Sequence, residues 1–393
     1  MDVGRYAKYA ARMCVGCGNC VDICPSYIAT GDLDNSPMGR IGMLRRGAGL
    51  AELYRSFYSC TMCKRCAYFC PLGLDVAEVT RQVRDFLARS GLRHPYVEKV
   101  VNNFVNRGNN IGMPPKVVEM SVRASLKKIE KEKGAAPRVY LHDGVRYIEG
   151  VTGAEQRPGG RVALLFPSSS DIFEFDLALR GYLYLLNRLG FDVVISLKVP
   201  DTANYGYFLD NASMYKIADM YLAEISRVSP HVVVFGECGH GWHVFASLVL
   251  PRSPAPALHI HQLLHRAYTK GVLRLERVEV RKPVLYMDPC NYSRGVAPLI
   301  EEPRILLRAV VGEYIELWDS PRKSLCCLGG GGLIAPETLN TAVEYWKRFD
   351  IKGVGTVVRP CATCKAQLKR VFNALGVDVD VTGVVELVYR AAR

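Results

Sequence analysis

Cysteine is the residue whose number and spacing most directly suggest chemistry in this chain. Two runs share the spacing C-x2-C-x2-C-x3-C, and each is followed by proline. This spacing lets one loop present three thiolates to three irons of a cubic cluster, while the fourth cysteine ligates the other cluster. The runs therefore predict two [4Fe–4S] cubanes. Their expected ligands are Cys14, Cys17, Cys20 and Cys70 for one cubane, and Cys60, Cys63, Cys66 and Cys24 for the other.

Zinc and disulfides explain these eight cysteines poorly. A structural zinc site takes four ligands, usually as two close pairs, and not three cysteines plus a distant fourth in two copies. Disulfides need an oxidising compartment. No apolar stretch follows a basic start, so we expect no secretory signal and a reducing, cytoplasmic location.

Five further cysteines lie in the C-terminal part of the chain. The first follows a predicted strand at residues 284–287, the last two follow another at residues 354–358, and the adjacent pair precedes the four glycines 329–332. Because the carboxyl ends of parallel strands share one crevice, these loops should converge. The glycines let the backbone pass close to a bulky inorganic body. The five are Cys290, Cys326, Cys327, Cys361 and Cys364.

The elements that must position these cysteines change in character along the chain. A helix is predicted at residues 76–88 from its apolar spacing. Residues 111–161 suggest a linker or adaptor, with a charged helix near residues 127–133 and a small hairpin near residues 139–148. Beyond residue 161, β-branched runs alternate with helical patterns, which is typical of α/β units with parallel sheets. The predicted strands are residues 162–166, 193–197, 232–235, 284–287, 314–317 and 354–358.

Length and charge limit the possible classes of protein. With 393 residues the chain should form more than one domain. A net charge of +13 is explained either by basic residues spread over the surface or by a basic face for an acidic protein or anionic membrane. No nucleic-acid-binding motif accompanies the charge, so nucleic acid is not expected as a partner. The most apolar window, residues 231–251, contains charged and histidine side chains and should not span a membrane.

The cysteine patterns resemble known families. The segment 25–59 between the two runs is longer than in a minimal bacterial ferredoxin and resembles the helical ferredoxin domain of succinate-dehydrogenase-type iron–sulfur subunits. The spacing C-x35-CC-x33-C-x2-C resembles the CCG domain of heterodisulfide-reductase-type proteins. That resemblance implies a noncubane [4Fe–4S] cluster, bound by the five C-terminal cysteines, that attacks a disulfide. One departure is Leu328, which separates the cysteine pair from the glycines.

Members of that family mostly carry the domain twice, and residues 162–241 repeat the same order of elements. Cys238 takes the place of Cys361. The other places fall on Ser168 for Cys290, on the stretch near Ala203 for the adjacent pair, and on Gly241 for Cys364. The first copy should therefore keep the scaffold without holding a second noncubane cluster.

Residues 236–243 read GECGHGWH. They resemble the GECGH segment of the heterodisulfide-reductase-like subunit in the membrane complex that serves dissimilatory sulfite reduction. The resemblance implies an α+β multidomain protein. Its expected parts are a helical ferredoxin domain with two clusters (1–110), a linker or adaptor (111–161), a degenerate CCG domain (162–280) and an intact CCG domain with the noncubane cluster (281–393).

The same segment supplies the candidate catalytic residues Cys238, Glu237 and His240. Cys238 is either a buried core thiol or a group beside the noncubane cluster that contacts substrate. Glu237 and His240 could supply the two protons that disulfide reduction consumes, since histidine titrates near neutrality; otherwise they hydrogen-bond the loop. No cysteine or carboxylate flanks the other nearby histidines, so we expect core or surface roles for His259, His261 and His265.

The expected function follows from counting electrons. Each cubane carries one electron, whereas cleaving a sulfur–sulfur bond takes two, so the five-cysteine site would hold the half-reduced state. The expected substrate is a disulfide or trisulfide of a small thiol conjugate or of a sulfur-carrier protein, and the GECGH resemblance favours the carrier. The expected partner is a membrane cytochrome b subunit that exchanges electrons with quinol, with the chain peripheral on the inner face of the cell membrane.

Two rivals remain open. One is an electron-relay subunit of a flavin dehydrogenase that passes electrons to quinone, but it predicts two intact cysteine-rich domains and no GECGH segment. The other is a purely structural C-terminal site with a conventional cubane or zinc, for which five thiolates are one too many.

Overall fold

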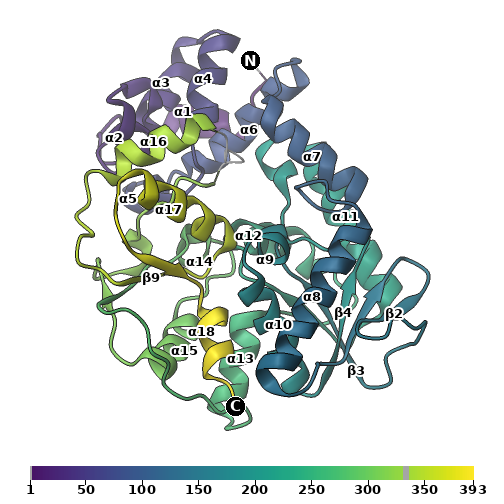
Figure 1. The fold of residues 1–393 in the computed structure, drawn as a ribbon. Coiled ribbons are helices and arrows are strands. Elements are labelled where there is room, and N and C mark those ends of the chain that lie inside the picture. The colour runs from purple at the N-terminus through teal and green to yellow at the C-terminus, as the bar shows by residue number, and fades with distance from the viewer. Residues whose placement is uncertain (1, 331–335) are drawn as a thin grey trace.

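The N-terminal region of the protein is helical. The structure is a computed structural model that describes residues 2–330 and 336–393 (Figure 1). Gly331 and Gly332 of the predicted glycine run lie outside the described residues. Among the described residues no strand precedes Val139. The helices before it are α1 (Arg5–Met13), α2 (Pro25–Thr30), η1 (Leu33–Asn35), α3 (Pro37–Arg46), α4 (Leu50–Ser59), α5 (Arg65–Phe69), α6 (Val76–Arg89), α7 (Pro95–Arg107) and α8 (Pro115–Lys133).

Helix α6 confirms the helix predicted at residues 76–88 and supports the second cysteine loop. Asp75 caps it by accepting hydrogen bonds from the backbone N–H groups of Ala77 and Glu78. Val79 and Val83, one helical turn apart, are fully buried and fix the face that the helix turns to the core.

The α/β part contains two sheets. The first has the order β2-β1-β4-β3-β5-β6, and the second has the order β10-β9-β7-β8. Every pairing is parallel except that between β1 and β2. The strands are β1 (Val139–His142), β2 (Tyr147–Glu149), β3 (Arg161–Phe166), β4 (Phe191–Ser196), β5 (Val232–Phe235), β6 (Ala257–His259), β7 (Val284–Tyr286), β8 (Ile315–Glu316), β9 (Thr356–Val358) and β10 (Asp380–Thr382).

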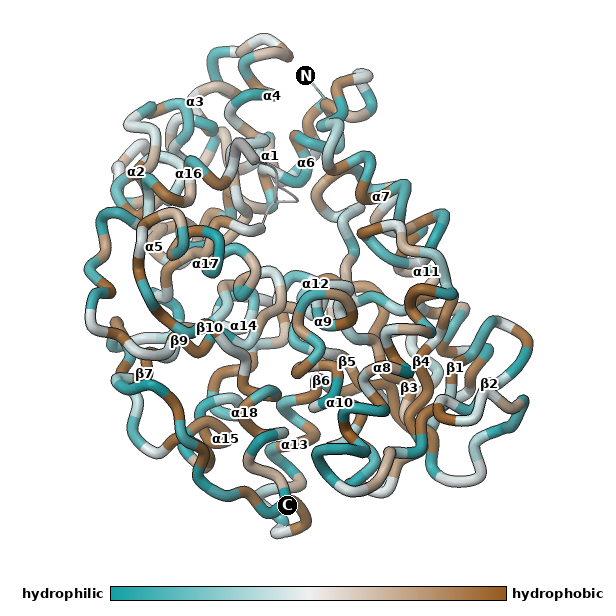
Figure 2. Tube along the Cα trace, in the orientation of Figure 1, coloured by the Kyte–Doolittle hydropathy of each residue, from teal (hydrophilic) through white to brown (hydrophobic). Residues whose placement is uncertain are grey.

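The parallel sheets and the mixture of helices and strands confirm that part of the predicted fold class, and each of the six predicted strands is present. The sheets also share a topology. Taken in chain order, β3 to β6 and β7 to β10 both lie side by side as second, first, third and fourth strand. In Figure 2 the strands of the first sheet are mostly hydrophobic, as expected for strands covered by helices on both faces.

The segment 111–161 is more than the linker or adaptor that its sequence suggests. The predicted hairpin is present as β1 and β2, but β1 also pairs with β4 and so extends the first sheet. All four residues of β1 are buried, which is why this run of alternating residue types behaves as an interior strand. Helix α8 packs on α10 and covers the sheet.

The remaining helices tie the three regions together. Helix α18 packs on both α10 and α15, so one hydrophobic core runs through both α/β regions. Helix α16 packs on α2 of the helical region, where Figure 1 places the two side by side. Within residues 2–330 and 336–393, every helix is too short or too polar to cross a lipid bilayer.

The helices that follow β3 belong to the α/β part of the chain. They are α9 (Ser169–Phe173), α10 (Asp176–Arg188), α11 (Asn211–Val228), α12 (Gly239–Leu248), α13 (Ile260–Thr269), α14 (Cys290–Arg294), α15 (Glu301–Val311), α16 (Pro336–Trp346), α17 (Ala362–Ala374) and α18 (Val384–Ala391), with the single 3-10 turns η2 (Tyr205–Phe208), η3 (Leu250–Arg252) and η4 (Pro321–Lys323).

Candidate functional site

The two N-terminal cysteine loops have the same backbone course despite different sequences. In the first loop Gly16 and Gly18 have φ of 72° and 82°. The matching positions of the second loop are Met62 and Lys64, with φ of 52° and 60°. Side chains other than glycine rarely adopt this left-handed region, at a cost of about 1 kcal/mol each. The second loop therefore accepts strain to keep the same cradle.

The eight thiols line two cavities of similar size. The space between atoms is about 340 Å³ in one and about 330 Å³ in the other, and part of it is open to solvent. Each cavity takes three cysteines from one loop and the last cysteine of the other run, which is the exchange expected from the spacing. The first is lined by Cys14, Cys17, Cys20 and Cys70, and the second by Cys24, Cys60, Cys63 and Cys66.

The spacing of these side chains suits a body larger than one ion. Nowhere in the described part of the chain are three His, Cys, Asp or Glu side chains grouped at the spacing of a single metal ion. The thiols surround a volume instead, and the amide of Met62 donates to the sulfur of Cys60 at 3.4 Å. Thiols around a cavity, with an amide directed at sulfur, fit an iron–sulfur cluster.

The exchanged cysteines yield a sharp prediction. Replacing Cys70 with serine should alter the signal of the cluster held by the first loop, whereas Cys24→Ser should alter that of the second. The reason is that each side chain lines the cavity of the other run. Electron paramagnetic resonance (EPR) of reduced protein, with Cys17→Ser and Cys66→Ser as references for the two signals, distinguishes the cases. If Cys70→Ser matched Cys66→Ser, the crossed assignment would be wrong.

The five C-terminal cysteines converge into one buried group, as their loops predict. Cys326 lies close to Cys290 and Cys327. Cys364 lies close to Cys327 and Cys361. Four of these thiols are buried and Cys290 is half-buried. A group of neighbouring thiols with one more exposed member is suited to hold an inorganic body that a substrate can approach from one side.

Backbone amides also face this group. Leu328 and Gly329 donate to the sulfurs of Cys326 and Cys327, both at 3.3 Å, and Gly239 donates to Cys361 at 3.4 Å. Leu328 has φ of 59°. The residue that departs from the expected glycine-rich pattern thus adopts a backbone conformation that glycine prefers, and the amides still reach sulfur.

The second cysteine loop touches the five-cysteine group directly. Cys63 lies close to Cys326. The hydroxyl oxygen of Thr61 lies 3.4 Å from the sulfur of Cys326, and Arg294 donates to the backbone carbonyl of Cys63 at 2.8 Å. The helical region and the second α/β region therefore meet at these cysteine loops.

Of the three candidate catalytic residues, Cys238 and His240 lie beside this group. The amide that follows Cys238 bonds to Cys361, and the Cys238 sulfur lies 3.8 Å from Nδ1 of His240. Burial raises the pKa of the Cys238 thiol and lowers the pKa of His240 to about 3. This low pKa favours a neutral imidazole at pH ~7, and proton donation by His240 stays a prediction.

Glu237 points elsewhere. Its carboxylate accepts hydrogen bonds from Nε2 of His261 at 2.8 Å and from the amide of Val385 at 2.9 Å. Its backbone carbonyl accepts from Ala362 at 2.8 Å. Glu237 thus joins β5 of the first sheet to α17 and α18 of the second region, which is a positioning role.

The three other histidines named from the sequence occupy ordinary places. His261 bonds Glu237, and buried His259 lies 2.8 Å from the hydroxyl of Tyr292. His265 is half-buried on α13, where its carbonyl accepts from Thr269.

Sequence reasoning missed one buried charge in the site. Arg359 is fully buried, and although burial lowers its pKa, the thiols of Cys364 and Cys327 raise it above the ordinary value. An arginine two residues before a cysteine gives no signal in the sequence, because its neighbours come from three distant loops.

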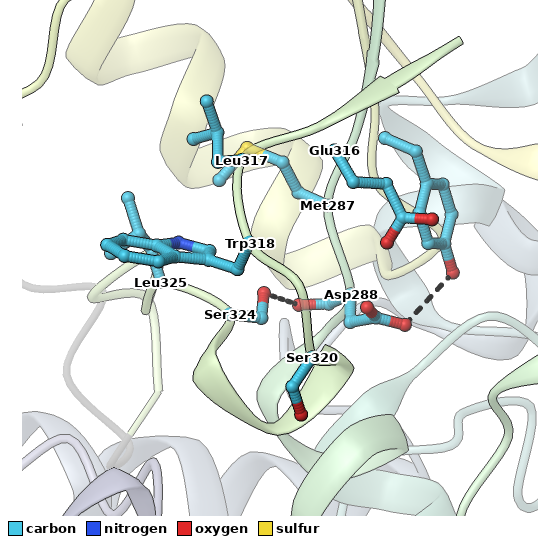
Figure 3. Close-up of a pocket in the computed structure, with 9 residues that line it drawn as sticks. Met287, Asp288, Glu316, Leu317, Trp318, Ser320, Ser324 and Leu325 are labelled. Atoms are coloured by element: carbon cyan, nitrogen blue, oxygen red, sulfur yellow. Dashed lines mark hydrogen bonds between the residues drawn. The ribbon is translucent and has the colours of Figure 1, made fainter.

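A crevice opens beside two of the cysteine loops (Figure 3). Asp288 and Leu325 line it, two residues before Cys290 and one before Cys326 respectively. The hydroxyl of Ser324 donates to the carbonyl of Asp288 at 2.7 Å and ties these loops together. Trp318, which is 39% exposed, lies at the same crevice. The crevice gives the Cys290 and Cys326 loops a face toward solvent.

Two family models match the chain. A 4Fe-4S dicluster domain matches residues 10–74, and a cysteine-rich domain, CCG, matches residues 284–369. Among solved structures, an aspartate racemase homologue from Pyrococcus horikoshii is 14% identical, covers 58% of this chain and 96% of that chain, and has a TM-score of only 0.26. That likeness is too weak to support an argument.

Relatives of known description align over nearly the full chain. The Hdr-like menaquinol oxidoreductase iron-sulfur subunit 2 of Archaeoglobus fulgidus is 26% identical, over 100% of this chain and 81% of the relative. One of the subunits of the dihydromethanophenazine:CoB–CoM heterodisulfide reductase of Methanosarcina acetivorans is 23% identical, over 96% and 93%. A probable glycolate oxidase iron-sulfur subunit of Bacillus subtilis is 32% identical, over 94% and 91%.

These matches agree with the cysteine geometry. The dicluster match spans both N-terminal cysteine runs, and the CCG match spans all five C-terminal cysteines. The chain is an oxidoreductase that uses iron–sulfur clusters, and it belongs to the family of heterodisulfide-reductase-like iron–sulfur proteins.

Proposed function

We propose that this chain relays single electrons through two [4Fe–4S] cubanes to a five-cysteine noncubane [4Fe–4S] site, where a disulfide or trisulfide is cleaved or formed. The observation that carries the proposal is the closeness of Cys63, in the cavity of the second cubane, to Cys326 of the five-cysteine group, whose sulfur lies 3.4 Å from the hydroxyl of Thr61 in the same loop as Cys63. Two ligand sets this close give electrons a short path. The bound clusters supply the one-electron carriers.

The chemistry balances with two electrons and two protons. A disulfide R–S–S–R′ gains two electrons as its sulfur–sulfur bond breaks, and each sulfur takes one proton to leave as a thiol. The electrons enter one at a time at the first cubane, where Cys17 is exposed to a partner. Half-buried Cys290 and the adjoining crevice offer the substrate its approach.

The segment around Cys238 closes the other side of the site. The amide of Gly239 holds Cys361, and neutral His240 lies against Cys238, which we place near the reacting sulfur as a substrate-contacting group. Glu237 orients the loop through His261 and Val385. The second carboxylate oxygen of Glu237, Oε2, has no hydrogen-bond partner among the described residues. We therefore keep Glu237 in the proposal as a donor of one of the two protons.

The division of the chain belongs to the proposal as well. We assign residues 1–110 to the cluster-bearing ferredoxin domain, 162–280 to a degenerate CCG domain and 281–393 to the intact one. Both α/β regions have the same strand order. In both, a cysteine caps the helix after the third strand: Cys238 before α12 and Cys361 before α17. The common order and the common cap support descent from one unit.

The partners follow from the relatives and from the resemblance of the GECGH segment. The Archaeoglobus relatives are menaquinol oxidoreductase subunits, which supports a membrane cytochrome b-type subunit that exchanges electrons with quinol. The chain would then lie on the inner face of the cell membrane. The GECGH segment favours a small sulfur-carrier protein as substrate, in a pathway of sulfite reduction.

A second function has an observation in its favour. The relative from Bacillus subtilis is a probable glycolate oxidase iron-sulfur subunit, which supports an electron relay between a flavin dehydrogenase and quinone. In that case the five-cysteine cluster would carry electrons without binding a sulfur substrate.

EPR of the oxidised protein distinguishes the two functions. We expect a paramagnetic signal from the five-cysteine site that changes when a thiol is added, together with about twelve irons per chain for three four-iron clusters. A signal indifferent to thiols would favour the relay. A content of about eight irons per chain would contradict the presence of a third cluster.

A further inference from the structure

Arg359 differs from the other buried cations of the α/β region. It follows β9 and is fully buried. Its Nη2 donates to two backbone carbonyls, that of Asp288 at 3.2 Å and that of Leu325 at 2.6 Å. Its Nε and Nη1 donors have no partner among the described residues. A guanidinium with two unused donors in a dry site is costly unless something negative faces it.

No carboxylate within the described part of the chain pairs with Arg359. By contrast, buried Arg304 pairs with Asp288 at 2.6 Å, and buried Lys365 pairs with Glu386 at 2.8 Å. Thiols from all three cysteine-bearing loops surround Arg359 instead, and the two carbonyls that it binds lie two residues before Cys290 and one residue before Cys326. The neighbouring thiols are Cys364, Cys327, Cys290 and Cys326.

We propose that Arg359 is the internal counter-cation of the five-cysteine site: its unused N–H donors face the sulfur of the bound cluster and make that cluster easier to reduce. Net charge and hydrogen bonds to sulfur both set the potential of an iron–sulfur cluster. A fixed positive charge favours the state with one more electron, because in a water-excluded site little screens it. The inference rests on the proposed cluster at these five cysteines.

Arg359 contributes hydrogen bonds between loops as well as a positive charge. Its planar guanidinium donates to the carbonyls of Asp288 and Leu325, and both of these residues line the crevice in Figure 3. Removing the side chain would therefore remove a charge and loosen two loops. Ser324 offers a matched control, because its hydroxyl binds the same Asp288 carbonyl without any charge.

The test is an EPR-monitored redox titration of four variants with clusters bound. Arg359→Met removes the charge and keeps a side chain of similar volume. At a fixed potential, the ratio of reduced to oxidised third cluster should fall at least tenfold in this variant. That fold-change equals a shift of about 59 mV for one electron. Arg359→Lys keeps the positive charge but loses the planar guanidinium and its several N–H donors, so the shift in the potential of the third cluster should be smaller.

The controls separate charge from structure. Ser324→Ala should leave the potential of the third cluster unchanged, as should Arg281→Met, which removes an exposed arginine paired with Asp378. The cubane signals should not move in any of the four variants. If Arg359→Met loses about four irons per chain, its third cluster cannot be titrated, and Arg359→Lys becomes the test. A third cluster that is present in Arg359→Lys with a near-native potential supports the inference. Loss of that cluster from Arg359→Lys contradicts it.

Two results would overturn the inference while leaving the proposed function intact. One is a native potential in Arg359→Met, and the other is an equal shift in Arg359→Met and Arg359→Lys. A native protein without a third signal would instead contradict the proposed function itself.

Discussion

Replacing Cys327 with serine is expected to abolish the cleavage of disulfide substrates while both cubanes stay in place. Cys327 is buried between Cys326 and Cys364, so a hydroxyl there breaks the middle of the thiol group. We expect the iron content to fall from about twelve to about eight atoms per chain, on the assumption of four-iron clusters. Activity should fall to the uncatalysed rate, because the five-cysteine site would lose the proposed cluster that holds a substrate sulfur between two one-electron steps.

The measurement uses reduced viologen as electron donor and a disulfide or trisulfide as acceptor, beside iron analysis and EPR. Cys238→Ala is the matched control, since Cys238 is buried beside the same site but lies outside the ligand set. It should keep about twelve irons. A Cys327→Ser protein that retained all its iron and its activity would contradict the assignment of the five cysteines.

Cys17→Ser extends the test to the entry of electrons. Cys17 is exposed and lines only the first cavity, so its loss should spare the thiol-dependent signal of the third cluster. Together with Cys66→Ser for the second cavity, these serine variants assign each iron signal to one set of thiols.

The two cysteine-lined cavities could be predicted from sequence because most of their cysteines are close together in the chain. Three of the four cysteines in each cavity lie within seven consecutive residues, so the spacing alone predicts their arrangement. Even the exchange of Cys24 and Cys70 follows from local structure, since each lies one short turn beyond its loop. Leu328 was less predictable, because a left-handed conformation at leucine leaves no mark in the sequence.

The strands of the α/β region were predictable for a similar reason, but their partners were not. Buried parallel strands read as β-branched runs, and β5 matches its predicted bounds. The pairing of β1 with β4 joins residues more than fifty positions apart. The short strand β10 alternates exposed and buried residues over three positions, too few for a pattern.

Buried charges were the least predictable feature. Arg359 and Lys365 lie in a stretch that reads as a helix start, and lysine and arginine are ordinarily exposed. Their partners come from loops and helices elsewhere in the fold, such as Asp171 on α9 and Glu386 on α18. Only the folded chain brings these charges together.

Removal of the Lys365 charge should have the largest effect on stability. Lys365 is fully buried one residue after Cys364, and its ammonium lies 2.8 Å from Glu386 and 3.5 Å from Asp171. Lys365→Met leaves two buried carboxylates without their cation, which typically costs about 3–5 kcal/mol of the free energy of unfolding. The melting temperature of the protein with its clusters bound measures the loss.

The double variant Lys365→Met/Glu386→Gln is the control, because it removes one carboxylate charge together with the cation. It should recover part of the lost melting temperature. If the single and double variants melted at the same temperature, lost packing and not uncompensated charge would explain the effect.

The pH dependence gives a second, independent check. Burial raises the pKa of Asp171 to about 6, against the attraction of Lys365, which lowers it. The folded protein therefore binds a proton more tightly than the unfolded chain, so the contribution of Asp171 to stability improves as pH falls through about 6. Without Lys365 the pKa of Asp171 should rise further, and the pKa of Glu386, which Lys365 now lowers, should rise with it. The gap in melting temperature between Lys365→Met and the native protein should consequently be wide near pH ~8 and narrower near pH ~5, and a gap that stayed constant would contradict a buried charge cluster at the junction of the two α/β regions.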